Sequence, residues 1–182
     1  MNPVPNPPEP SARRERGLDE ELMLEVVSED PSPDRIRDLV RRGANPNSAA
    51  ITGENNLLAD AITTIPHGLP IAIVKMLVDL GADVNADPGG EGCRPLFQAC
   101  LAGIPDLVAF LLAKGADPNF FIEKHETLLD WVSFDRYFHA EVEALATDSD
   151  RYMVRAYGEI IPMLKAAGAR SASEDGSIPP KP

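Results

Sequence analysis

Aliphatic residues recur at a spacing of three in four segments of the chain, and each segment ends at a glycine. The segments read DRIRDLVRR, AIVKMLVDL, DLVAFLLAK and EIIPMLKAA, and they precede Gly43, Gly81, Gly115 and Gly168. A spacing of three places side chains on one face of a helix, and a glycine can adopt the left-handed conformation that ends one. The pattern therefore predicts four helices with two buried columns, formed by Ile36, Val74, Val108 and Ile161 and by Leu39, Leu77, Leu111 and Leu164.

A second helix is predicted ahead of three of these segments. The starts read NLLADA from Asn56, RPLFQA from Arg94 and TLLDWV from Thr127. The phrases GANPN, GADVN and GADPN and a shorter GAR begin at the four glycines, which are 38, 34 and 53 residues apart. A period of about 33 residues with insertions accounts for these separations.

Residues 94–119, RPLFQACLAGIPDLVAFLLAKGADPN, resemble an almost complete ankyrin repeat. The three helix starts are similar to the T-P-L-H-x-A phrase of that family, and residues 18–47 are similar to an N-terminal capping repeat. The resemblance covers roughly residues 18–133 and 159–170. It implies an all-α fold, an ankyrin-repeat solenoid of about four helix-turn-helix repeats at about residues 18–47, 48–85, 86–119 and 120–170.

The last of these repeats carries an inserted segment of about twenty residues within 134–158. The insertion contains an amphipathic spacing of Phe134, Phe138, Val142 and Leu145. Ser149 or Asp150 is a suitable cap for a further helix that runs through Tyr157, and Pro162 then lies either in the first turn of the last helix or at a kink. We expect at least one added helix that packs on the last repeat with its aromatic face inward.

The two ends of the chain and one internal stretch lack regular periodicity. Residues 1–17, which are rich in proline, and the tail 171–182 have no apolar repeat, so both are predicted to be disordered around a folded domain at 18–170. Within the domain, the prolines and glycine of TTIPHGLPIAIV from Thr63 cannot continue a helix. They predict a longer loop between the two helices of the second repeat.

The charge of the chain argues against two classes of partner. There are 17 basic and 29 acidic residues, a net charge of −12, so the phosphates of nucleic acids and of anionic lipids would repel the protein. The uncharged stretches are too short to span a bilayer, and the N-terminus lacks the apolar centre of a secretory signal. We therefore expect a cytoplasmic protein that binds neither nucleic acid nor membrane.

The residues that usually carry catalysis or metal binding are scattered. Cys93 and Cys100 form no CxxC or Cys/His pattern, and both are expected to be small buried groups. His67, His125 and His139 form no HxxxH pair, and Gly89-Gly90-Glu91-Gly92 lacks the lysine of a phosphate-binding loop. The sequence thus predicts no catalytic residue, no metal site and no cofactor.

The candidate site is a surface for a protein partner on the turn tips and on the first helices. Asp60, Gln98 and Trp131 occupy the variable position of the helix-start phrase, although Trp131 could instead cover the seam to the insertion. Phe120 and Phe121, directly after GADPN, are the expected apolar anchors. Eight of the ten aromatic residues of the chain lie between 120 and 157, and the pattern does not separate core from interface. The full candidate set is Asp60, Asp87, Glu91, Gln98, Phe120, Phe121, Glu123, Trp131, Tyr137, Glu141 and Glu143.

These features favour a noncatalytic protein-binding module that acts as a monomer. The short array and elaborate last repeat resemble ankyrin-type immunity proteins that are encoded beside bacterial toxins. That resemblance implies a bacterial inhibitor of a basic toxin or effector, which would be attracted by the acidic surface. The alternative is an ankyrin scaffold or adaptor without an inhibitory role. An enzyme would instead require a deep pocket lined by convergent polar groups.

Overall fold

The helices of the chain are arranged in antiparallel pairs. The computed structural model describes residues 17–48, 56–87, 94–123, 126–141 and 147–172. The paired helices are α1 (Leu18–Val26) with α2 (Pro33–Arg41), α3 (Leu57–Thr64) with α4 (Ile71–Asp79), α5 (Pro95–Leu101) with α6 (Pro105–Ala113), and α7 (Leu128–Glu141) with α8 (Asp148–Ala166). A short hairpin, β1 (Phe121–Glu123) with β2 (Glu126–Thr127), precedes α7. The described part of the chain is therefore mostly helical.

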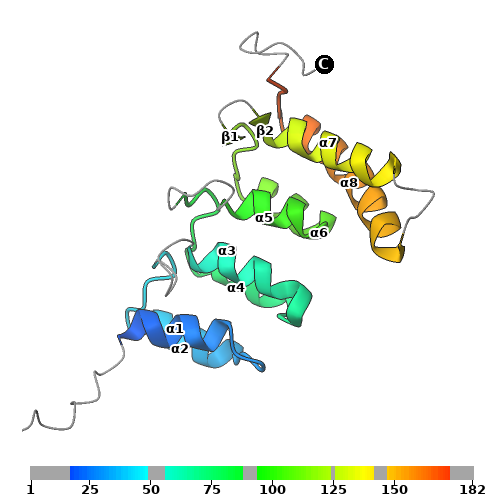
Figure 1. Cartoon of the computed structure of the whole chain (residues 1–182). Coiled ribbons are helices and arrows are strands. Elements are labelled where there is room, and N and C mark those ends of the chain that lie inside the picture. The colour runs from blue at the N-terminus through cyan, green and yellow to red at the C-terminus, as the bar shows by residue number, and fades with distance from the viewer. Residues whose placement is uncertain (1–16, 49–55, 88–93, 124–125, 142–146, 173–182) are drawn as a thin grey trace, which may run out of the picture.

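The pairs stack one after another from α1 and α2 to α7 and α8 (Figure 1). Helix α5 contacts α3 on one side and α7 on the other, and α6 contacts α8. We call α1, α3, α5 and α7 the first-helix layer and α2, α4, α6 and α8 the second-helix layer. Residues at equivalent positions in successive pairs therefore lie in rows along the stack.

Each second helix ends at the glycine that the sequence predicts. Gly43, Gly81, Gly115 and Gly168 have φ angles of 108°, 101°, 89° and 86°. This left-handed region is energetically unfavourable for a residue with a Cβ atom. The next amide donates back to the carbonyl of the leucine column, as in Ala116 N to Leu111 O at 3.0 Å. This six-to-one bond is the Schellman arrangement that satisfies the last carbonyls of a helix.

The two predicted columns form the centre of the stack. All four leucines, Leu39, Leu77, Leu111 and Leu164, are buried, as are Ile36, Val74 and Val108. Ile161 is only half-buried, and its neighbour Ile160 is fully buried in its place. The predicted register is confirmed, with this shift of one residue in the last helix.

The asparagines of the turn phrases connect each turn to the next one. Asn85 Nδ2 donates to Gly115 O at 2.9 Å, and Asn85 Oδ1 accepts from Asp117 N at 2.7 Å. Asn47 makes the same two bonds one turn earlier, and Asn119 bonds Gly168 O and Arg170 N one turn later. A recurrent asparagine suggests a bond to its own turn backbone, but the structure shows that its side chain bridges neighbouring turns.

The predicted starts of the earlier helices are confirmed. Helices α3, α5 and α7 begin directly after Asn56, Arg94 and Thr127, and the Asn56 side chain caps α3 by accepting a bond from Ala59 N at 2.8 Å. The predicted longer loop between α3 and α4 is also present. It contains a 3-10 turn at Ile65–His67 and a left-handed Gly68.

The insertion lengthens two helices, and the prediction of an added helix is wrong for the residues that the structure describes. Phe134 is equivalent to Leu101, where α5 ends, but α7 continues to Glu141. Helix α8 begins at Asp148, whereas its equivalent α6 begins ten residues before its terminal glycine. Thr147 caps α8 in a reciprocal capping box with Asp150, and Pro162 lies inside the helix. We call residues 135–141 and 148–157 the α7–α8 extension.

The extension packs on the turn between α5 and α6. The Tyr152 hydroxyl donates to Gly103 O at 2.8 Å. Gly103 has a φ of +64°, and a Cβ atom there would lie 2.7 Å from Met153 Sδ. The backbone conformation favours glycine at this position, and a Cβ atom would also require the Met153 side chain to shift. The extension is thus anchored to the preceding helix pair.

Candidate partner-binding surface

The row of variable positions lies on three first helices that contact one another in series. Asp60, Gln98 and Trp131 are half-buried at equivalent places in α3, α5 and α7. The Trp131 ring meets Phe97 edge-on at 4.9 Å between ring centroids and Tyr157 at 6.4 Å. Trp131 therefore covers the seam between α5 and the last helix pair while part of its surface remains accessible.

Exposed side chains follow one helical turn beyond this row. Thr63, Leu101 and Phe134 lie three residues after the variable positions, and all three are exposed. Leu101 and Phe134 are large apolar groups at equivalent places of neighbouring helices. We call the six residues the first-helix row: Asp60, Thr63, Gln98, Leu101, Trp131 and Phe134.

The expectation that Phe120 is an exposed anchor is wrong. Its side chain is 7 % exposed, and the Arg94 guanidinium lies 4.9 Å from the centre of its ring. Arg94 is in turn paired with Asp87 at 2.8 Å. Side chains alternate between the two faces of an extended segment, so Phe120 and Ile122 are buried while Phe121 is 56 % exposed.

Several acidic candidates cannot be placed by their side chains. Glu91 and Glu143 lie outside the described residues, as do Val142 and Leu145 of the predicted amphipathic pattern. Glu123 belongs to β1 and Glu141 is the last residue of α7. Of the acidic candidates, the structure therefore locates the carboxylates of Asp60 and Asp87 only.

The aromatic side chains of α7 face outward, against the expectation that they pack inward. Phe134, Tyr137 and Phe138 are 62 %, 61 % and 55 % exposed. They lie at positions i, i+3 and i+4, which are neighbours on a helix surface. We call these three residues the α7 aromatic face. Of them, the sequence had singled out Tyr137 as a surface candidate.

The reason for this reversal is the phase of α7. Leu128 and Val132 are fully buried, and the same helix face continues through Asp135 and His139, at seven and eleven residues from Leu128. Polar residues thus occupy the face that packs on α8. Extending the phase of Leu128 and Val132 along the helix would have revealed the exposed aromatic residues.

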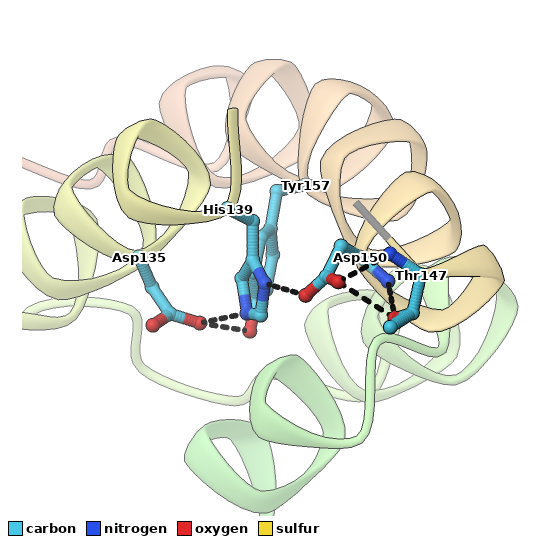
Figure 2. A network of polar contacts seen from close by, with 5 residues as sticks. All are labelled: Asp135, His139, Thr147, Asp150 and Tyr157. Atoms are coloured by element: carbon cyan, nitrogen blue, oxygen red, sulfur yellow. Dashed lines mark hydrogen bonds and ion pairs between the residues drawn. The ribbon is translucent and has the colours of Figure 1, made fainter. Parts of the chain in front are cut away.

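A network of polar side chains joins the two helices of the extension (Figure 2). The Tyr157 hydroxyl donates to Asp135 Oδ2 at 2.8 Å, and His139 Nε2 lies 3.6 Å from the same oxygen. His139 Nδ1 lies 2.9 Å from Asp150 Oδ1. The other Asp150 oxygen accepts from both the amide and the hydroxyl of Thr147, at 2.8 and 2.6 Å. His139 is therefore held between carboxylates from both helices.

The network changes the ionisation of two of its members. The hydroxyl of Thr147 and then His139 bond the Asp150 carboxylate and lower its pKa to about 2. Burial, followed by the hydrogen bond to Asp135, raises the pKa of Tyr157. Asp150 is therefore a carboxylate and Tyr157 a neutral hydrogen-bond donor at neutral pH.

The stability of the chain should fall as Asp150 is protonated. Because the folded state lowers the pKa of Asp150 from 3.8 to about 2, its contribution is complete above about pH 4 and is lost as the pH falls toward 2. Denaturant unfolding at several pH values between 5 and 2 measures this loss. In the variant Asp150→Asn, stability should depend less steeply on pH. The variant Asp148→Asn leaves the contacts of Asp150 intact and should retain the wild-type dependence. Equal slopes for wild type and Asp150→Asn would refute the assignment.

The polar side chains of the extension hold α7 and α8 together. Both ring nitrogens of His139 face carboxylates, and Tyr157 is fully buried. Burial also raises the pKa of the Cys100 thiol, which disfavours the reactive thiolate. In the described part of the chain, no group of His, Cys, Asp and Glu side chains could hold a metal ion.

Comparison with known proteins identifies one segment of the chain. Among the described helices, none is long and apolar enough to cross a membrane. No curated protein shows a significant match to the chain. Residues 91–120, which span α5, α6 and the turn after them, match the family model described as Ankyrin repeat.

Proposed function

We propose that this chain is a protein-binding module, built from four ankyrin-type repeats in a solenoid, that binds its partner through the first-helix row and the adjoining turn tips. Ankyrin repeats are generally protein–protein interaction modules. Stacked helix pairs provide an extended and preorganised surface, so little ordering entropy is lost when a partner binds.

One observation carries the proposal. Leu101 and Phe134 are exposed apolar side chains at equivalent positions of α5 and α7, beside the unlike residues Gln98 and Trp131. Apolar groups that are scattered singly on a surface need no explanation, whereas groups aligned along successive helices are typical of an interface. The row thus combines apolar contact with variable polar positions that would provide specificity.

The remaining candidates extend this surface at its edges. Phe121 and Tyr137 are exposed aromatic residues and would add apolar contact. The acidic candidates Asp87, Glu91, Glu123, Glu141 and Glu143 would form a rim that attracts a basic partner. Charges at a rim act mainly on the association rate and its salt dependence.

The role that we favour is inhibition of a basic toxin or effector by a monomer in the bacterial cytoplasm. A net charge of −12 favours a basic partner, and a preformed surface suits tight binding to a single target. The alternative is a scaffold or adaptor that uses the same surface. The two roles differ in one outcome, because an inhibitor abolishes the activity of its captured partner and an adaptor leaves that activity intact.

The surface is tested by binding kinetics with a partner that has been isolated by affinity capture from native lysate. The variants Phe121→Ala and Phe134→Ala should raise the dissociation rate, since aromatic contacts carry much of the energy of an interface. Neutralisation of the rim by Glu141→Gln and Glu143→Gln should slow association and weaken its dependence on ionic strength. Ala109→Ser, on the exposed side of α6, is the matched control. Unchanged kinetics in every variant would remove this surface from consideration.

A further inference from the structure

The α7 aromatic face is the largest group of exposed apolar side chains on one helix of the described chain. Its members Phe134, Tyr137 and Phe138 are each more than half exposed. Removal of aromatic surface from water lowers the free energy of the protein. Three adjacent aromatic residues on one helix therefore indicate a segment that covers them.

The chain itself leaves the described structure at the start of this face. Arg170 N donates to Asn119 Oδ1 at 3.0 Å, and Ala172 N donates to Asp130 Oδ2 at 2.8 Å. Ala172 is buried, so the packed chain continues two residues past the predicted domain end. In Figure 1 this last described segment lies beside the beginning of α7.

Asp130 lies on the same side of α7 as the aromatic face. Phe134 follows it by four residues and Tyr137 by seven, which are the spacings of one helix face. The contact between Ala172 and Asp130 thus places the end of the described chain at the first turn of α7, one helical turn before Phe134. A segment that continues from this point along α7 would pass directly over the aromatic residues.

The length of the remaining chain is sufficient for this path. Ten residues follow Ala172, and an extended proline-rich segment rises about 3.1 Å per residue, or roughly 30 Å in total. The distance along the helix from Asp130 to Phe138 is only about 12 Å, at 1.5 Å per residue. The segment can therefore span the face even if it first turns at Gly176.

The sequence of the segment matches the surface in both polarity and charge. It reads SEDGSIPPKP, with Ile178, Pro179 and Pro180 as its apolar part. Proline-rich segments lose little entropy on docking and pack well on aromatic rings. On such a path the acidic Glu174 and Asp175 would come first, near the positive N-terminal end of the α7 dipole, and Lys181 would come last, toward its negative end.

We infer that residues 173–182 fold back along α7 and cover the α7 aromatic face in the free chain. A partner that uses Phe134 or Tyr137 must then displace this tail. The tail is therefore an intramolecular ligand, in place of the disordered end that its composition predicts. The inference concerns the chain alone, so it stands or falls independently of the proposed partner.

A spin label near the C-terminus tests the inference in the full chain. The label is attached to Pro182→Cys in a Cys93→Ser background, because Cys100 is fully buried and will not react. Paramagnetic broadening of amide signals then reports proximity. We expect selective loss of the signals of residues 134–141, with the signals of α1 and α2 unaffected. The variant Ile178→Ser/Pro179→Ser/Pro180→Ser should restore them.

Three other outcomes would overturn the inference. The first is broadening that is absent from α7 or spread evenly along the chain. The second is selective broadening of α7 from a label at Ser11→Cys, which would assign the face to the N-terminal segment. The third is broadening in a mixture of labelled chains with isotope-enriched unlabelled chains, which would assign it to a second copy. The dispersion of the amide signals shows for each variant whether it is folded, so loss of folding does not obscure the result.

Discussion

Replacing Leu111 with alanine should lower the free energy of unfolding by about 2–5 kcal/mol, the range for removal of a buried leucine side chain. Leu111 is fully buried in α6, and the equivalent leucines Leu77 and Leu164 occupy the same place in the neighbouring pairs. All three side chains belong to the same buried hydrophobic core. Denaturant unfolding of the variant measures the loss.

The neighbouring residue supplies the control for this experiment. Leu112 has the same side chain and the same helix propensity but is only half-buried, so Leu112→Ala should cost clearly less. Similar losses in the two variants would mean that helix formation rather than burial decides the result. A loss below about 1 kcal/mol in Leu111→Ala would be too small for a fully buried leucine and would contradict the register.

Replacing Tyr157 with alanine should cost about 3–5 kcal/mol, the range for removal of a large buried aromatic ring. Tyr157 is fully buried where α7 and α8 meet, and its ring contacts Trp131 while its hydroxyl bonds Asp135. Its removal would leave a cavity and would also remove a hydrogen-bond donor from the Asp135 carboxylate. The extension should then open, which hydrogen exchange of residues 148–157 would report.

The variant Tyr157→Phe separates the ring from the hydroxyl. It retains the packing and loses only the bond to Asp135, which is about a quarter exposed and can bond water instead. We expect a cost of about 1 kcal/mol, typical of a single hydrogen bond. If Tyr157→Phe were as damaging as Tyr157→Ala, the polar network rather than the packed ring would hold the extension.

The parts of the fold that repeat along the chain could be predicted from the sequence. The leucine column and the glycines at each helix end recur four times, so each occurrence supports the register of the others. The helix starts at Asn56, Arg94 and Thr127 follow from the same comparison. The role of the asparagines could not be derived in this way, because their bonds join turns that lie thirty or more residues apart.

The parts that occur only once were predicted less well. The aromatic spacing in the insertion fits a buried face as well as an exposed one, and only the burial of Asp135 and His139 against Tyr157 decides between them. Phe120 and Phe121 are identical residues in adjacent positions, and only the pairing of β1 with β2 shows which one is buried. Both differences change the candidate surface, since the first adds Phe134 to it and the second removes Phe120 from it.

Site-specific photo-crosslinking in native lysate tests the partner-binding claim most directly. p-Benzoylphenylalanine is placed at Leu101, on the first-helix layer, or at Ala109, an exposed position of α6 on the second-helix layer. Binding through the first-helix row predicts a discrete crosslinked species with one other protein from the Leu101 position and none from the Ala109 position. A crosslink from Ala109 alone, or none from Leu101 while the partner is still captured, would contradict the account.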